Sequence, residues 1–191
     1  MTMIVGVIAK SGILLASDTR CMVGNPKKFV GHHEQARKIA VSTESTPARI
    51  ACAIACGSHF SFGESVITFA LSWLSKHRFN RNTSLHVIHC EFEQRYKNIN
   101  SQLPTGFSIT SVFAKFEGGC PCISYGTLGK SIAVNAHSGV FCYPKIPDDA
   151  FEHSLPTRED AIAFVKEQIT SKATPQSPIG STVDICAYYR Q

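Results

Sequence analysis

Apolar residues near the start of the chain fall into two short runs that a turn separates. Ile4–Ala9 is rich in β-branched residues, Lys10-Ser11-Gly12 is typical of a turn, and residues 13–16 form the second run. Such runs predict two buried strands that pair as a hairpin. The second run ends at Ser17-Asp18-Thr19-Arg20, so the hairpin is expected to bring Asp18 close to Thr2.

The spacing of apolar residues then changes between strand and helix. Residues 37–42 and 49–56 are strand-like, and from about residue 58 to 77 the apolar positions follow helical intervals. A second helix is predicted over residues 84–99, capped by Asn82, Thr83 or Ser84, with a buried face that includes Val87, Ile88, Phe92 and Tyr96. Further strands are predicted at residues 107–116, 122–125, 131–135 and 183–189, and Thr157-Arg158-Glu159-Asp160 is a capping signal that opens a third helix.

This order predicts an α+β protein rather than a doubly wound sheet, because runs of strands and runs of helices replace strict alternation. Periodicity alone does not choose among α+β folds. A chain of 191 residues suits one domain, and residues 1–191 contain no repeat or long linker that would divide it.

Composition excludes several classes of function. The net charge of +5 comes from basic residues that are scattered rather than clustered, so a nucleic-acid surface is not expected. No apolar segment approaches the roughly 18 residues that a membrane helix needs. The N-terminus lacks the features of a secretion signal, so we expect a cytoplasmic protein whose eight cysteines are reduced thiols.

His86, His89 and Cys90 lie together on the second predicted helix and could form half of a metal site. A structural zinc ion needs four converging ligands, and no complementary pair stands out elsewhere in the sequence. We therefore expect neither a metal nor an organic cofactor.

Thr2 is the residue with the most distinctive potential chemistry, because removal of Met1 would make it the first residue of the chain. A terminal threonine carries a nucleophilic hydroxyl and a free α-amine on adjacent atoms. That amine has an ordinary pKa of about 7.7–8.0, so much of it is neutral and able to act as a base at physiological pH. Many proteins begin with Met-Thr, so this signal is weak when it is taken alone.

The residues that follow strengthen it. The segments Thr2–Val7, Gly12–Arg20, Gly24, Ala36–Ile39 and Ala53–Gly57 together resemble the first third of a proteasome β-subunit and of the related bacterial peptidase HslV. Both are N-terminal-nucleophile hydrolases, so the resemblance implies a four-layer αββα sandwich. It also implies a catalytic set in which Thr2 is the nucleophile, Asp18 and Lys38 form a supporting pair and Gly57 donates its N–H to the oxyanion.

The C-terminal part agrees less well with this resemblance. Gly180–Cys186 resembles the closing strand of many proteasome subunits, but the aspartate and serine that often precede it have no match in residues 175–179. Ser177 could substitute only after a shift. Ser138-Gly139 resembles a Gly-Ser-Gly turn whose serine contacts the α-amine, so Ser138 joins the implied site, although His137 replaces the first glycine.

The implied function is a threonine-type endopeptidase that hydrolyses unfolded protein or peptides inside a homo-oligomeric ring, without a cofactor. The family resemblance also implies an ATP-dependent unfoldase as a partner, which no residue of this sequence identifies. Two alternatives stay open: a catalytically silent ring scaffold of the same fold, and an amidase or ligase that uses the same threonine.

Overall fold

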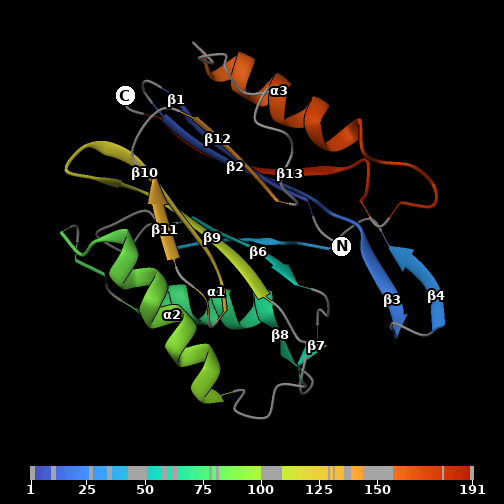
Figure 1. The fold of residues 1–191 in the computed structure, drawn as a ribbon, viewed down its shortest axis with the longest axis horizontal. Helices are drawn as coiled ribbons and strands as arrows, with labels where there is room; N and C mark the ends of the chain where they lie inside the picture. Colours follow the sequence, from blue (N-terminus) through green and yellow to red (C-terminus); the bar gives the residue numbers. More distant parts are fainter. Residues whose placement is uncertain are drawn as a thin grey trace.

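The structure is a computed structural model that describes residues 3–9, 12–25, 28–33, 36–42, 51–56, 60–61, 64–77, 79–80, 82–99, 109–128, 130, 132–135, 139–143, 157–177 and 179–189. Within these residues the chain forms a four-stranded sheet, a five-stranded sheet, two small two-stranded sheets and three helices. The helices and the two larger sheets are stacked across the molecule (Figure 1).

The four-stranded sheet has the order β12-β1-β2-β13. Its strands are β12 (Gly139–Tyr143), β1 (Ile4–Ala9), β2 (Gly12–Asp18) and β13 (Val183–Tyr189). The predicted hairpin is present, since Ile4 pairs with Ser17 and Ala9 pairs with Gly12. The sequence pattern assigned no strand to residues 139–143, yet β12 pairs with β1 along its whole length and completes this sheet.

The five-stranded sheet is also antiparallel and has the order β11-β10-β9-β6-β5. Its strands are β5 (Ile39–Val41), β6 (Ala51–Cys56), β9 (Ile109–Glu117), β10 (Cys120–Thr127) and β11 (Ile132–Asn135). Gly118 and Gly119 form the turn between β9 and β10 with φ angles of 54° and 84°, a region that glycine enters without the steric penalty of a Cβ. The small sheets pair β3 (Cys21–Asn25) with β4 (Lys28–His33), and β7 (Phe60–Ser61) with β8 (Glu64–Ser65).

The helices are α1 (Val66–Lys76), α2 (Leu85–Ile99) and α3 (Arg158–Thr170). The prediction that the first helix begins near residue 58 is wrong, because β7 and β8 precede it and pair Phe60 with Ser65. Gly63 lies in this stretch of sequence, and glycine disfavours a helix interior. At α2, Ser84 is the cap, since its hydroxyl accepts a hydrogen bond from the N–H of Val87 at 3.3 Å.

Three apolar clusters hold these elements together. Along β1 the side chains alternate: Ile4 and Ile8 face the five-stranded sheet, while Val5 and Val7 pack with α3. A strand that is buried on both faces reads as a continuous apolar run, which is why this segment lacks polar positions. The third cluster joins α1 and α2 to the other face of the five-stranded sheet through residues such as Trp73, Phe92 and Phe113.

One predicted core position of α2 is wrong. Val87 is 52% exposed, whereas Leu85, Ile88, Phe92 and Tyr96 are buried. The remaining buried places on this helix belong to His89 and Glu93, polar residues that an apolar pattern passes over.

The fold is therefore a mixed α/β arrangement of two larger antiparallel sheets and, among the described residues, three helices. Figure 1 shows α3 on one side of the molecule and α1 and α2 on the other, with the strands between them. In the part of the chain that the structure describes, no helix is long and apolar enough to cross a membrane.

Candidate active site

The end of β2 carries a buried ion pair. Asp18 is the last residue of β2, and Lys38 directly precedes β5 in the opposing sheet. Lys38 Nζ donates a hydrogen bond to Asp18 Oδ2 at 3.0 Å, and neither side chain is exposed to solvent. The two sheets thus contribute one charge each to a contact that water does not screen.

Three backbone N–H groups converge on the same carboxylate. The N–H of Met3 donates to Asp18 Oδ1 at 2.8 Å, while the N–H groups of Arg20 and Gly180 donate to Oδ2 at 3.2 and 3.1 Å. A buried carboxylate is tolerated only when such donors and a counter-ion replace its lost water. Asp18 therefore connects the start of the chain, the end of β2 and the segment before β13.

Arg20 holds that last segment in place. Its Nη1 donates hydrogen bonds to the carbonyl oxygens of Thr174 and Ser177 at 2.7 and 2.5 Å, and the residue is only 7% exposed. Sequence reasoning did not single out Arg20. Its position two residues after Asp18, just beyond an apolar strand, could have indicated that it is buried near the site. Its hydrogen-bond partners could not be predicted, because they lie more than 150 residues away in the chain.

Ser177 has a local structural contact. Its Oγ accepts a hydrogen bond from the N–H of Ile179 at 3.0 Å, and its own N–H donates to Thr174 Oγ1 at 2.9 Å. These bonds stabilise the turn that leads to Gly180. The hydroxyl therefore uses one of its acceptor positions within its own loop.

The five predicted site residues divide into two groups. The structure brings Asp18 and Lys38 together. Met3, the residue after Thr2, donates its backbone N–H to Asp18. Thr2, Gly57 and Ser138 lie outside the described residues. The catalytic roles of all five residues stay predictions.

A second buried polar cluster lies beneath α2. His89 Nδ1 is 2.5 Å from Ser124 Oγ, and His89 Nε2 is 2.7 Å from Ser111 Oγ. Burial, with a smaller contribution from the charge of His86, lowers the pKa of His89 from 6.5 to about 3, so the ring is neutral near pH 7. His89 thus points into the core, and the described residues contain no group of three or more His, Cys, Asp or Glu side chains that could hold a metal ion.

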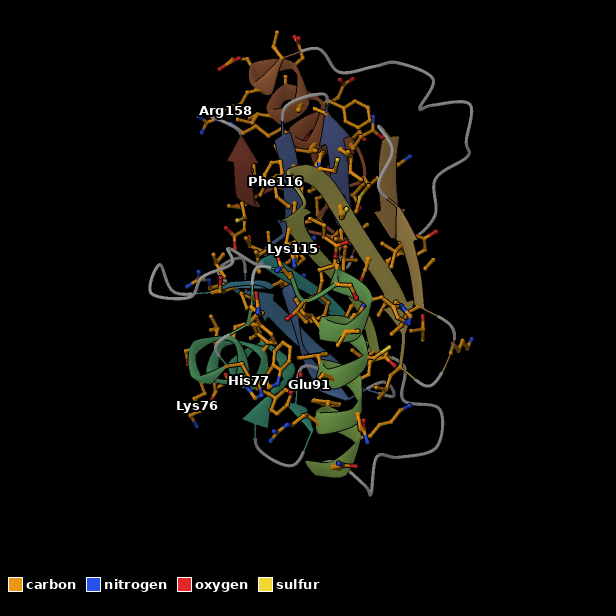
Figure 2. The ribbon with its side chains drawn as sticks, turned by 90° about the vertical axis from the view of Figure 1, so that its left-hand side faces the viewer. Lys76, His77, Glu91, Lys115, Phe116 and Arg158 are labelled. Carbon is orange, nitrogen blue, oxygen red and sulfur yellow. The ribbon has the colours of Figure 1, made fainter. Side chains whose placement is uncertain are left out.

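Lys115 is a second buried lysine, at the N-terminal end of α2 (Figure 2). Its Nζ donates to the carbonyl oxygen of Thr83, and the carboxylate of the neighbouring Glu117 accepts from the N–H of Leu85. Burial lowers the pKa of Lys115, and the charge of Glu117 opposes that shift. These contacts secure the beginning of α2 on β9.

Comparison with solved structures identifies proteins of the same fold. Anbu (ancestral beta-subunit) from Yersinia bercovieri matches with a TM-score of 0.65 and 13% identity over 98% of this chain and 81% of that chain. A Gly-1 mutant of Anbu from Hyphomicrobium sp. strain MC1 gives 0.68 and 15% over 99% and 82%, and another Anbu structure from that strain gives 0.64 and 12% over 98% and 82%. No protein-family model and no curated protein matches the chain.

These similarities show the fold, since the identities are low, and they correct the family expected from the sequence. The prediction of a proteasome β-subunit or HslV-like family member is wrong, because the structural neighbours are Anbu proteins, which are proteasome-like but form a distinct family. The motifs that suggested that family therefore do not identify it.

Proposed function

We propose that the chain is an N-terminal threonine peptidase, in which Thr2 becomes the nucleophile once Met1 is removed. The observation that carries the proposal is the buried Asp18–Lys38 pair, whose carboxylate also accepts the N–H of Met3. Thr2 and Met3 share a peptide bond, so this contact ties the charged pair to the start of the chain. A buried ion pair is costly, and one beside a potential nucleophile is a candidate for chemistry.

The same proposal interprets the described core as an αββα sandwich of the N-terminal-nucleophile type. Its support is the order of the contacts: α3 packs on the four-stranded sheet, that sheet packs on the five-stranded sheet, and α1 and α2 pack beyond it. The similarity in fold to Anbu, named as an ancestral β-subunit, agrees with this interpretation.

In the proposed reaction the Thr2 hydroxyl oxygen attacks the carbonyl carbon of a peptide bond, and its proton passes to the α-amine of the same residue, through a water molecule. The positive charge of Lys38 disfavours protonation of that amine and favours the developing alkoxide. Asp18 holds the ammonium of Lys38 in position. The N–H of Gly57 stabilises the oxyanion, and the amine then activates water to release the acyl group.

We further propose that the protein works as a ring of identical subunits on unfolded protein or peptide substrates. The support is the fold similarity to proteins whose name includes "beta-subunit". Native mass spectrometry of the purified full-length chain tests this assembly. A closed oligomer is expected, and a monomer at micromolar concentration would contradict it.

The test of the proposed chemistry is the intact mass of the protein before and after incubation with a peptide epoxyketone, which reacts with both the hydroxyl and the free amine of a terminal threonine. We expect loss of Met1 and one adduct on each chain. The variant Thr2→Ala should fold, form no adduct and hydrolyse no peptide. Peptidase activity that persists in Thr2→Ala would disprove the mechanism.

One observation favours a catalytically silent scaffold as the second candidate. The Ser177 hydroxyl accepts a hydrogen bond within its own turn, and residues 175–179 contain no aspartate. Retention of Met1 in the purified protein, together with an intact oligomer, would favour the scaffold over the peptidase.

A further inference from the structure

A groove of about 360 Å³ lies beside α2, bounded by residues of α2, of β11 and of the turn before β11. It contains none of the residues placed in the candidate active site. The side chains that matter for its chemistry are Cys90, His86, Gln94, Lys97, Lys130 and Glu93. A nucleophile, a base and two cations therefore share one depression of the surface.

The nucleophile and the base form a direct pair. Cys90 and His86 are one helical turn apart, and Cys90 Sγ lies 3.5 Å from His86 Nε2. Cys90 is a free thiol and is exposed to solvent. When the imidazole is neutral with Nε2 unprotonated, that nitrogen can accept a hydrogen bond from the thiol and lies in position to take its proton as the sulfur reacts with an electrophile.

The charge around this pair is mostly positive. Lys97 lies on α2 beyond Cys90, and Lys130 lies in the turn that leads to β11. The acidic residue among the lining side chains, Glu93, is 6% exposed, and its carboxylate lies 3.8 Å from the ring of the buried His89. The groove therefore suits a small ligand that carries carboxylates, with the amide of Gln94 as an additional polar contact.

We propose that this groove is a site of thiol–disulfide exchange with small anionic disulfides, of which glutathione disulfide is the type. The Cys90 proton passes to His86 Nε2, and the Cys90 thiolate attacks one sulfur of the disulfide. A new sulfur–sulfur bond forms to Cys90, the original bond breaks, and the other half leaves as a thiolate that takes up a proton. The disulfide is the oxidant, so no other reactant is required.

The chain contains a matched control in Cys120, which is also a free and exposed thiol. Cys120 lies opposite Glu117 in the pairing of β9 with β10, so a negative charge takes the place of the imidazole and the lysines. Exposure alone predicts similar reaction rates for the two cysteines. The proposed site predicts that Cys90 reacts faster.

The experiment follows the reaction of the full-length protein with glutathione disulfide, with the modified peptides quantified by mass spectrometry. We expect Cys90 to react on the order of tenfold faster than Cys120. The difference should disappear when the chain is unfolded in urea. A folded-state rate for Cys90 no higher than that for Cys120, or a difference that survives unfolding, would overturn the proposal.

Variants separate the base from the cations. His86→Gln should slow the reaction of Cys90 with both glutathione disulfide and the uncharged hydroxyethyl disulfide. The double variant K97Q/K130Q should slow only the reaction with glutathione disulfide, by roughly three- to tenfold at low salt. Lys166→Gln, an exposed lysine on α3, is the matched control and should change neither rate. Equal effects of K97Q/K130Q and Lys166→Gln would show that the groove does not select anions.

Discussion

The carboxylate of Asp18 and the imidazole of His89 are both buried, but their surroundings differ in charge. Asp18 meets the ammonium of Lys38 and three backbone N–H groups at the end of β2. His89 meets two serine hydroxyls in the middle of a packed helix–sheet interface, with the carboxylate of Glu93 at 3.8 Å from Nε2, and its ring is neutral near pH 7. One cluster thus keeps an ion pair inside the protein, whereas the other places a titratable group there without charge.

The difference supports a structural role for His89 and the proposed chemical role for the Asp18–Lys38 pair. A neutral imidazole with both nitrogens bonded contributes to the shape of the core and leaves no reactive charge. A buried ion pair stabilises a protein less well than apolar packing of the same volume in many cases, so stability alone gives little reason to keep it. The charged cluster is accordingly the place where we expect chemistry.

The sharpest test of this comparison uses the two buried lysines. Lys38→Met removes the counter-ion of Asp18, and we expect peptidase activity to fall by about 10²–10⁴-fold, the range typical of lost acid–base function. Lys115→Met removes a lysine that is equally buried but bonds to the start of α2, away from the Asp18–Lys38 pair. Activity is measured per folded molecule, with the folded fraction taken from urea unfolding.

Both substitutions are expected to lower the free energy of unfolding, and Lys38→Met by more, about 3–5 kcal/mol, because it leaves a buried carboxylate without its cation. Only Lys38→Met should affect the chemical step. Equal losses of activity in the two variants would contradict the division between the clusters.

The second prediction concerns Arg20, which links the charged cluster to the loop before β13. Arg20→Met removes two part-buried hydrogen bonds from a guanidinium to backbone carbonyl groups, so we expect a loss of about 3 kcal/mol in the free energy of unfolding. Activity should fall about tenfold through displacement of the loop. Hydrogen exchange at the N–H of Gly180 should become faster.

Arg37→Met is the matched control for Arg20. Arg37 lies next to Lys38 in sequence, but its side chain is exposed and donates to the carbonyl of Ile39. We expect it to change stability by less than about 1 kcal/mol. Unchanged exchange at Gly180 in Arg20→Met would show that the arginine does not position the loop.

The third prediction tests the neutral cluster by its pH dependence. The pKa of His89 falls from 6.5 in the unfolded chain to about 3 in the folded one, so the unfolded state binds a proton first as the pH drops. The stability that this group contributes is therefore complete above pH 6.5 and is lost as the pH falls toward about 3. Between pH 6.5 and about 5 the loss through His89 should be about 2 kcal/mol.

His89→Gln should remove this acid-dependent loss, because glutamine can bond to the serines but does not titrate. Urea unfolding at neutral and mildly acidic pH measures the difference. His86→Gln, an exposed histidine on the same helix, should leave most of the loss in place. A His89→Gln variant with the same pH dependence as the parent chain would assign the effect to another group.

Local patterns in the sequence predicted the elements whose causes are local. The apolar runs on either side of Lys10-Ser11-Gly12 specify the first hairpin, and the spacing of Thr157 and Asp160 specifies the start of α3. Long-range partners were beyond such reasoning. The pairing of β12 with β1 and the contacts of Arg20 with Thr174 and Ser177 depend on segments more than 130 residues away.

The candidate site shows the same division. The family resemblance predicted that Asp18 and Lys38 belong to one site. No rule of sequence spacing predicts that the N–H groups of Met3 and Gly180 donate to the carboxylate of Asp18. Val87 illustrates the opposite error, since an apolar residue was assigned to the face where the buried His89 lies. Burial of a polar residue depends on partners from other strands, which a helical pattern does not contain.

The smallest effect on stability is expected at the N-terminal cap of α3, which belongs to neither buried cluster. Thr157 Oγ1 accepts a hydrogen bond from the N–H of Asp160 at 3.1 Å and donates one to its carboxylate at 2.6 Å. Thr157→Ala should cost about 1 kcal/mol of unfolding free energy, and Thr157→Ser should restore most of it, because the hydroxyl and not the methyl group makes the cap. Peptidase activity should not change, since α3 contacts the four-stranded sheet through Ala161, Val165 and Ile169. If Thr157→Ser is as destabilised as Thr157→Ala in urea, the capping hydrogen bond is not the cause.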